Sequence, residues 1–269
     1  TRLCLDPSAI VADRLDKAVS SILFSATLTP LPYYRDMLGG GADDVMLTLP
    51  SPYDPGRLLL LAHAGISTKY REREKSYGPI AKVIRTVTEA RTGNYLVFFP
   101  SYDYMRKVAE RYLEYAPGTE LLIQSGRMDE TEREAFLHRF DRANPHTLIG
   151  FCVLGGIFSE GIDLKGDRLI GSIVVGVGLP GLSLRQEQIR EYFDQRGGHG
   201  YDYAYVYPGI NKVLQAAGRV IRSEEDSGIA LLIDTRFDTA KYRSLFPEHW
   251  SRIRFLHNDA QLREVLEEF

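Results

Sequence analysis

The chain carries the stretch Gln215-Ala216-Ala217-Gly218-Arg219-Val220-Ile221-Arg222, whose polar residues are spaced by four and three positions. On a helix, this spacing places Gln215, Arg219 and Arg222 on one face. Two planar guanidinium groups side by side can hold an anion, and a nucleoside triphosphate is the obvious candidate. A solvated face near a helix C-terminus, where arginines also favour the helix dipole, explains the two arginines equally well. These residues alone leave both interpretations open.

The composition indicates a globular protein. With 269 residues, 44% apolar content and a formal charge of −3, the chain allows one large α/β domain or two small ones. It has no run of about 18 apolar residues and no signal-like start, so we expect a cytoplasmic protein with no membrane partner. Cys4 and Cys152 lie far apart among apolar neighbours, which predicts reduced, buried thiols and no metal site in this chain. The net charge does not decide the partner, because local basic patches can still bind phosphates.

Short apolar runs alternate with charged segments of helical period along the chain. The runs predict strands at residues 21–24, 45–49, 57–62, 94–99, 120–125, 147–153, 169–175 and 228–234. Helices are expected at residues 68–91, with an interruption at Gly78-Pro79, and at 102–115, 129–142, 184–196 and 259–269. This alternation predicts an α/β fold with a largely parallel sheet and helices on both faces.

Polar residues follow several of the predicted strands. Ser25 and Ser101 each come directly after a strand, Ser125 is the last residue of one, and the loop at residues 154–164 carries glycines and carboxylates. The carboxyl ends of parallel strands and the free N–H groups of helix N-termini are common ligand sites. Ordinary helix capping by a serine, and a flexible glycine connection without a ligand, are the alternatives.

Four stretches, in order along the chain, resemble helicase motifs. Residues 215–222 match the Q-x-x-G-R-x-x-R pattern of motif VI of superfamily 2 helicases at every fixed position. Three others resemble motifs V, IV and III of the XPD/DinG-type helicases: Ser159-Glu160-Gly161-Ile162-Asp163, Phe98-Phe99-Pro100-Ser101-Tyr102 and Ser25-Ala26-Thr27-Leu28-Thr29-Pro30. The chain therefore resembles the second RecA-like domain of such a helicase, and the resemblance covers residues 1–269 as one motor domain.

The resemblance implies an ATP-dependent DNA helicase that moves 5′ to 3′ along single-stranded DNA. Arg219 and Arg222 would contact the γ-phosphate of ATP, and Gln215 would contact the nucleotide or its attacking water. Glu160, Gly161 and Asp163 would belong to the nucleotide side, with Asp163 suited to a ribose hydroxyl or to coupling, since a carboxylate does not favour bare phosphate. The DNA backbone would be held by Ser101, Tyr102, Ser125 and Ser159.

Other parts of such an enzyme are absent from the sequence. It contains neither a G-x-x-x-x-G-K-[ST] phosphate loop nor a D-E-A-H-type box. ATP and Mg²⁺ would therefore be held mainly by a first RecA-like domain, which would also carry an iron–sulfur cluster in those relatives that have one. Because the chain starts at Thr1 in mid-pattern, we expect a piece of a longer protein, inactive on its own, whose partners are that first domain and single-stranded DNA.

Two rival functions remain. The first is a RecA-like module that binds nucleic acid or protein without turnover. The second is an α/β hydrolase or transferase, suggested by His63 and His199, although each histidine is more simply explained as structural or solvated. The tyrosines at residues 201–207 could stack on bases, but packing within the protein explains them as well.

Overall fold

The computed structural model describes residues 4–141, 144–159 and 162–269. Its strands are β1 (Leu58–His63), β2 (Asn94–Phe99), β3 (Glu120–Ile123), β4 (Leu148–Val153), β5 (Gly171–Val175), β6 (Gly228–Ile233) and β7 (Arg254–Leu256). Its helices are α1 (Ser8–Leu15), α2 (Leu31–Met37), α3 (Arg73–Ala90), α4 (Tyr102–Tyr115), α5 (Glu130–His138), α6 (Leu184–Gly197), α7 (Tyr207–Ala217), α8 (Ala240–Arg243) and α9 (Asp259–Glu268). None of the helices in these ranges is both long and apolar enough to cross a membrane.

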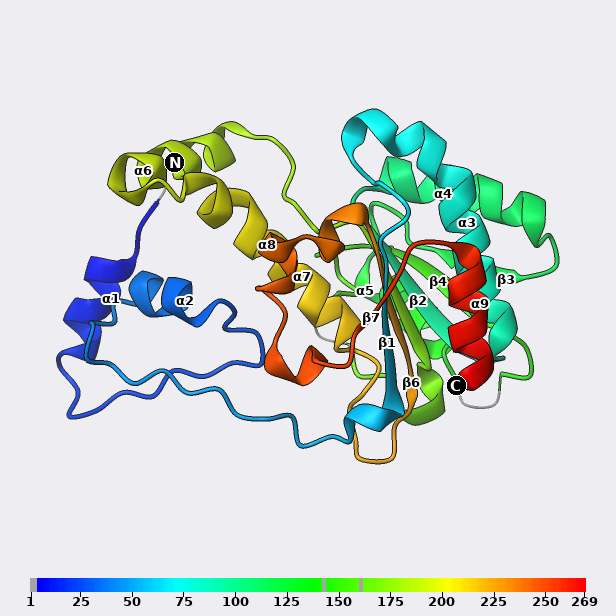
Figure 1. Ribbon diagram of the computed structural model, residues 1–269, viewed down its shortest axis with the longest axis horizontal. Coiled ribbons are helices and arrows are strands. Elements are labelled where there is room, and N and C mark those ends of the chain that lie inside the picture. Colours follow the sequence, from blue (N-terminus) through cyan, green and yellow to red (C-terminus); the bar gives the residue numbers. More distant parts are fainter. Residues whose placement is uncertain (1–3, 142–143, 160–161) are drawn as a thin grey trace.

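The described strands form one parallel sheet in the order β3-β4-β2-β5-β6-β1-β7. Helices α3, α4 and α9 cover one face, and α5, α7 and α8 lie on the other (Figure 1). Each face of the sheet packs against its own apolar core. Because the strands are buried on both faces, their sequences are continuous apolar runs. The predicted α/β class, with a RecA-like sheet covered on both sides, is confirmed.

Most predicted elements appear with small shifts of their ends. Strand β2 and helix α4 have the expected limits, because Ser101 caps α4 by accepting a hydrogen bond from the Tyr104 N–H at 3.3 Å. Helix α3 runs through Pro79 without the expected interruption, since Ile80 and Val83 are buried against the sheet. Helix α5 ends at His138, before the predicted limit. Strand β7, of three residues, was missed.

The two strands predicted near the N-terminus are wrong. Residues 21–24 and 45–49 form no strand, and Phe24 and Val45 are 90% and 92% exposed. The segment that contains them stands out from the body, with α1 and α2 beside α6 (Figure 1). None of the described residues before Ser51 is buried. The apolar runs are therefore real, but nothing in the described chain covers them.

Tyrosines join this N-terminal segment to the body. The ring of Tyr33 in α2 lies 4.7 Å from that of Tyr203 and 5.0 Å from that of Tyr207. Residues Asp202–Val206 form a π-helical turn that continues into α7. Packing within the protein is thus the role that the structure gives to Tyr203 and Tyr207.

The two cysteines differ in their exposure to solvent. Cys152 is buried in β4, and burial raises the pKa of its thiol well above the usual value. Cys4 is exposed, so the prediction of burial is wrong for that residue. Both thiols are free.

Candidate functional site

Gln215, Arg219 and Arg222 do not share one helix face. Helix α7 ends at Ala217 and Gly218 follows as its cap, so Gln215 lies on the helix while Arg219 and Arg222 lie beyond it. The predicted single helix face is therefore wrong, because the helix stops at the glycine. The two arginines converge in another way. Nη1 of Arg219 and Nη2 of Arg222 both donate to the carbonyl oxygen of Ile162, at 3.1 and 3.4 Å.

Arg219 also holds the start of the same loop. Its Nη2 donates to the carbonyl oxygen of Ser159, so one guanidinium binds two backbone carbonyl groups that lie three residues apart. Charged donors make stronger hydrogen bonds than neutral ones. The loop that follows β4 is thereby fastened to the end of α7.

The backbone of Arg222 is fixed from two sides. The carboxylate of Asp226 accepts from the N–H groups of Arg222 and Ser223 at 2.7 and 2.8 Å, and from the N–H of Gly166 at 3.0 Å. Burial alone would raise the pKa of Asp226, but these hydrogen bonds outweigh it and lower the pKa. The hydroxyl of Tyr53 donates to the Arg222 carbonyl at 3.1 Å. The side chain is less satisfied, because its buried Nε has no hydrogen-bond partner among the described residues.

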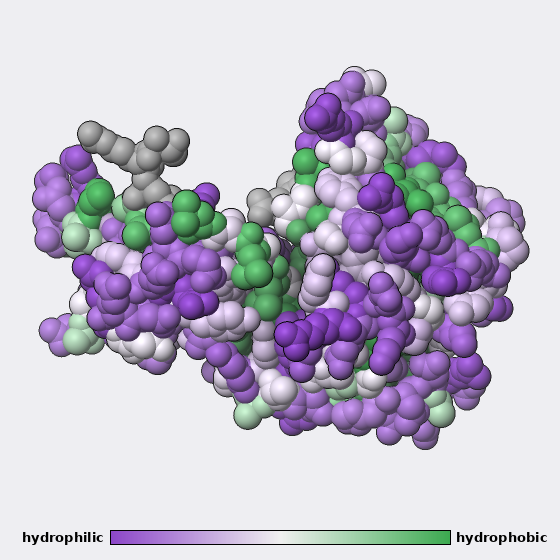
Figure 2. Space-filling model, turned by 90° about the horizontal axis from the view of Figure 1, so that it is seen from above, coloured by the Kyte–Doolittle hydropathy of each residue, from purple (hydrophilic) through white to green (hydrophobic). Residues whose placement is uncertain are grey.

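Gln215, Arg219 and Arg222 line one wall of a cavity of about 1620 Å³. Residues 18–29 and 44–55 line the same cavity. On the other side of the molecule, apolar side chains lie exposed between the lobe that carries α6 and the body (Figure 2). The structure thus brings the three residues that sequence reasoning singled out to one space.

The other residues predicted for the nucleotide side are less well placed. Asp163 is exposed, outside the cavity lining, and paired with Lys165 at 3.2 Å. Glu160 and Gly161 lie outside the described residues. The carboxylate of Asp226 is occupied by backbone N–H groups, and no group of three or more His, Cys, Asp or Glu side chains in the described ranges could hold a metal ion. Asp163 and Asp226 therefore have partners within the described protein, and neither belongs to a cluster of metal-ligating side chains there.

A second polar group lies at the carboxyl ends of β2, β3 and β4. Gln124, 3% exposed, donates from Nε2 to the hydroxyl of Tyr102 at 3.0 Å, and its Oε1 accepts from the N–H of Val153 at 2.8 Å. Its amide therefore links three strand ends and orients the Tyr102 hydroxyl. Ser101 is half-buried beside it and Ser125 is exposed. Sequence reasoning named Ser101, Tyr102 and Ser125 but missed Gln124, which orients the hydroxyl of Tyr102.

Ser159 faces inward. It is fully buried, and its hydroxyl accepts from the Gly155 N–H at 2.8 Å and donates to the Val153 carbonyl at 3.3 Å. Its own carbonyl accepts from Arg219. Ser159 therefore links the end of β4 to the arginines instead of presenting its hydroxyl at the surface.

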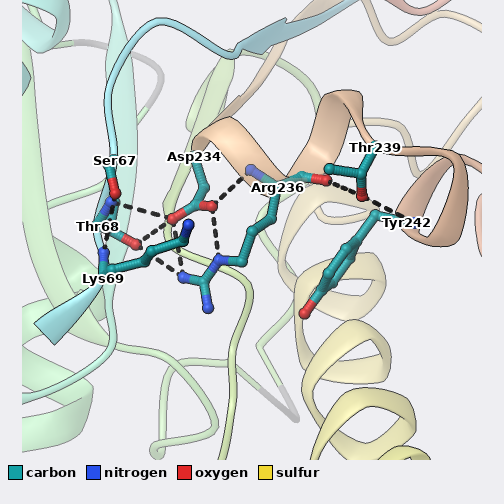
Figure 3. A network of polar contacts seen from close by, with 7 residues as sticks. All are labelled: Ser67, Thr68, Lys69, Asp234, Arg236, Thr239 and Tyr242. Carbon is teal, nitrogen blue, oxygen red and sulfur yellow. Dashed lines mark hydrogen bonds and ion pairs between the residues drawn. The ribbon is translucent and has the colours of Figure 1, made fainter.

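A buried ion pair ties the carboxyl ends of β1 and β6 together (Figure 3). Arg236 donates from Nε and Nη2 to the two oxygens of Asp234, at 2.7 and 2.9 Å, and from Nη2 to the hydroxyl of Thr68 at 3.2 Å. The N–H and hydroxyl of Thr68 also donate to Asp234. Burial alone would raise the pKa of Asp234, but Arg236 and Thr68 outweigh it and lower the pKa. The Asp-x-Arg pattern directly after a buried strand was the signal that could have revealed this network.

The two histidines behave as structural or solvated residues. His63 is 2% exposed, and burial lowers its pKa, so its ring is neutral near pH 7. Its Nε2 lies 3.6 Å from Oδ1 of Asp259, which is too long for a hydrogen bond. His199 is exposed. This geometry gives no support to the hydrolase alternative.

Comparisons with a protein family and with curated proteins agree on the same kind of domain. Residues 84–253 match the family described as helicase C-terminal domain. The ATP-dependent DNA helicase DinG of Photobacterium profundum is 31% identical over 235 residues, covering 84% of this chain and 33% of DinG. The ATP-dependent DNA helicase YoaA of Escherichia coli is 28% identical over 255 residues, covering 91% of this chain and 38% of YoaA. The chain thus spans about a third of the length of these curated relatives.

A solved structure titled XPD helicase has the same fold. It superposes with a TM-score of 0.70 at 21% identity, over 94% of this chain and 45% of that one. At this identity the match concerns the fold alone, and it agrees with the parallel sheet described above.

Proposed function

This chain belongs to the helicase C-terminal domain family, as the C-terminal helicase domain of an XPD/DinG-type superfamily 2 protein, and from that premise we propose that it is the second motor domain of an ATP-dependent 5′–3′ DNA helicase. One observation carries the proposal. Gln215, Arg219 and Arg222 line one cavity together with an N-terminal segment rich in exposed apolar side chains. Two guanidinium groups beside exposed apolar side chains are the arrangement expected where a second domain packs against this one and a nucleotide binds between them.

The nucleotide would bind between this cavity wall and the first RecA-like domain. The guanidinium groups of Arg219 and Arg222 would contact the γ-phosphate and stabilise the charge that develops during phosphoryl transfer, and Gln215 would contact the nucleotide or its attacking water. The unsatisfied Nε of Arg222 is consistent with a site that a ligand completes. Asp163, with Glu160 and Gly161, would serve the ribose or the coupling between sites. Mg²⁺, and any iron–sulfur cluster, would be held by the first domain.

The size of the cavity supports a protein neighbour as well as a nucleotide. Small-molecule sites are commonly about 300–1,000 Å³, whereas this space measures about 1620 Å³. Residues 21–24 and 45–49 have strand-like sequences, but they pair with no strand in the part of the chain that the structure describes. Burying them against the first domain would remove their apolar side chains from water, at roughly 25 cal/mol per Å². That domain is therefore the proposed partner of these segments.

Single-stranded DNA would lie along the carboxyl ends of β2, β3 and β4. Ser101, Tyr102 and Ser125 would contact its sugar-phosphate backbone, which carries no base sequence. We assign Ser159 to the link between the two sites, since its hydroxyl is bonded inside the protein and its carbonyl accepts from Arg219. ATP hydrolysis removes the γ-phosphate from Arg219 and Arg222, so the cleft opens and the grip on the strand changes. Such a protein would work where chromosomal DNA lies, in the bacterial cytoplasm or nucleoid.

The test is ATP hydrolysis by the protein that joins this chain to its first domain, measured with and without single-stranded DNA and beside the isolated chain. We expect DNA-stimulated turnover in the complete protein and none in the isolated chain. Arg222→Ala should lower turnover by about a thousandfold or more, as loss of an arginine finger does. Arg85→Ala is the matched control, because Arg85 lies on the exposed side of α3 and pairs only locally with Glu89.

Two results would contradict the proposal. Unchanged DNA-stimulated turnover in Arg222→Ala would remove the arginine from the chemistry. Absence of turnover from the complete protein would favour the other candidate, a RecA-like module that binds nucleic acid or protein without hydrolysis.

A further inference from the structure

Three side chains form a stack at the carboxyl end of β1. The guanidinium carbon of Arg73 lies 5.3 Å from the ring centroid of Tyr70 and 5.2 Å from that of Tyr104. The inner end of the stack is fixed, because Tyr104 is 1% exposed, hydrogen-bonded to Ser76 and packed edge-on against Tyr77 at 5.2 Å. The outer end is open, since Tyr70 is 83% exposed.

The buried ion pair of Figure 3 positions the outer end of this stack. Tyr70 begins a short 3-10 turn two residues after Thr68, whose N–H donates to Asp234 at 3.1 Å. Thr68 also accepts from Arg236 at 3.2 Å. The backbone that leads into Tyr70 is therefore anchored to β6, so a ligand that binds the ring does not have to order this segment of backbone as well.

The surroundings of Tyr70 are positively charged. Residues 69–75 read Lys-Tyr-Arg-Glu-Arg-Glu-Lys, with four cations against two carboxylates. Nη1 of Arg236 makes no hydrogen bond within the described residues, and in Figure 3 it points away from Asp234. Surfaces that bind single strands combine such positive charge with aromatic rings on which bases stack.

The stack adjoins the strand ends already assigned to DNA. A Cβ added at Gly176, just after β5, would lie 3.0 Å from Oγ1 of Thr68 and 4.0 Å from Cγ of Pro100. Thr68, two residues before Tyr70, and Pro100, directly before Ser101, thus both lie next to Gly176. A strand lying on Ser101 and Tyr102 could continue toward Tyr70 without leaving the carboxyl edge of the sheet.

We infer that the exposed ring of Tyr70, backed by Arg73, is a stacking surface for a base of single-stranded DNA. The inference rests on the proposed function and extends it, because the residues assigned there contact only the DNA backbone. A base on the outer face of Tyr70 would continue the order of ring, guanidinium and ring. Stacking tolerates any base sequence, since every base offers a flat π face, which suits a motor that moves along DNA.

The experiment compares Tyr70→Ala and Tyr70→Phe in the protein that joins this chain to its first domain. Fluorescence anisotropy at one salt concentration gives the affinity for labelled oligothymidine and for an abasic oligomer of the same length. Tyr70→Ala should weaken oligothymidine binding by about 5- to 150-fold and leave abasic binding unchanged. Tyr70→Phe keeps the ring and should bind both oligomers as the natural protein does. Phe269→Ala, which removes another exposed ring, is the control.

The outcomes separate this inference from the proposed function. If the natural protein binds both oligomers and Tyr70→Ala weakens neither, or weakens both equally, stacking at Tyr70 is overturned while the helicase assignment stands. If the natural protein binds neither oligomer, the proposed function fails and this inference fails with it.

Discussion

Arg219 donates a hydrogen bond from Nη1 to the carbonyl oxygen of Ile162 at 3.1 Å, across 57 positions of sequence. This bond joins two of the stretches that resemble helicase motifs. It also gives Arg219 a structural role that Arg222 shares only weakly, through a 3.4 Å contact to the same oxygen. Stability measurements can therefore separate the two arginines.

Arg219→Ala should destabilise the isolated chain. Carbonyl groups of Ser159 and Ile162 would lose a charged donor, and hydrogen bonds to charged groups contribute about 1.5–3 kcal/mol each. Arg219→Lys should restore only part of the loss, because an ammonium group lacks the planar fork. Urea unfolding gives the free energies, with Arg85→Ala as a control expected to stay within about 0.5 kcal/mol of the natural chain. Equal stability of Arg219→Ala and the control would contradict this role.

Gln124→Leu should also lower stability, for a different reason. The change leaves the Val153 N–H without the acceptor that it has at 2.8 Å, and an unsatisfied buried donor costs about 1–3 kcal/mol. The Tyr102 hydroxyl loses its donor too, so in the complete protein we expect weaker binding of single-stranded DNA. Urea unfolding and anisotropy measure the two effects. Gln195→Leu, at an exposed position of α6, is the control, and a Gln124 variant that behaves like it would refute the argument.

Asp234→Asn should destabilise the chain in a pH-dependent way. It leaves Arg236 without its buried partner, which costs about 3–5 kcal/mol at pH 7. The folded-state pKa of Asp234 lies below the usual value of 3.8. The carboxylate therefore stabilises the fold above the unfolded pKa, and that contribution is lost as the pH falls through the folded pKa.

The measurement for Asp234 is urea unfolding from pH 7 down to pH 3. The difference between Asp234→Asn and the natural chain should be constant near neutrality and should narrow as the pH falls below about 4. Asp13→Asn, at an exposed position paired only with Lys17, should show little difference at any pH. If the difference in the free energy of unfolding between Asp234→Asn and the natural chain does not change with pH, the carboxylate of Asp234 is not the titrating group.

Removing residues 1–50 should leave the sheet folded. None of the described residues in this segment is buried, and its ring contacts from Tyr33 to Tyr203 and Tyr207 are worth about 0.5–1.5 kcal/mol each. We expect cooperative urea unfolding with a loss of about 1–3 kcal/mol, and less binding of a hydrophobic dye. Phe24→Ser in the whole chain should reduce dye binding at unchanged stability, because Phe24 is 90% exposed. Loss of cooperative unfolding on truncation would show that the segment belongs to the core.

The sequence predicts this fold well where local signals and tertiary packing agree. Residues 95–99 are apolar and buried throughout, and Ser101 caps the helix that follows. Residues 21–24 carry an equally apolar pattern, yet they form no strand, because a strand needs a neighbour that the described chain does not supply. Pro79 suggested a break, but burial of Ile80 and Val83 outweighs the local cost.

In the candidate site too, local sequence predicts some residues, while others depend on contacts with distant parts of the chain. Gln215, Arg219 and Arg222 could be named from their spacing, and they do line one cavity. Arg219 and Arg222 are brought together by hydrogen bonds to the carbonyl oxygen of Ile162, a backbone group that no side-chain pattern reveals. Gln124 escaped notice because its partner Val153 lies on another strand, 29 positions away. For Asp234, the local Asp-x-Arg pattern was readable, but its contact with Thr68 spans 166 positions.

The loop after β4 has a mechanical consequence. Its start is fastened at the carboxyl end of the strand by the Ser159 hydroxyl, and its end is fastened ahead of β5 by the Gly166 N–H on Asp226. Between these anchors, Arg219 grips it through the Ser159 and Ile162 carbonyls. In the proposed motor, a phosphate that draws the guanidinium of Arg219 toward itself would also pull on the carbonyl groups of Ser159 and Ile162. Through the hydroxyl of Ser159, the pull would reach the end of β4.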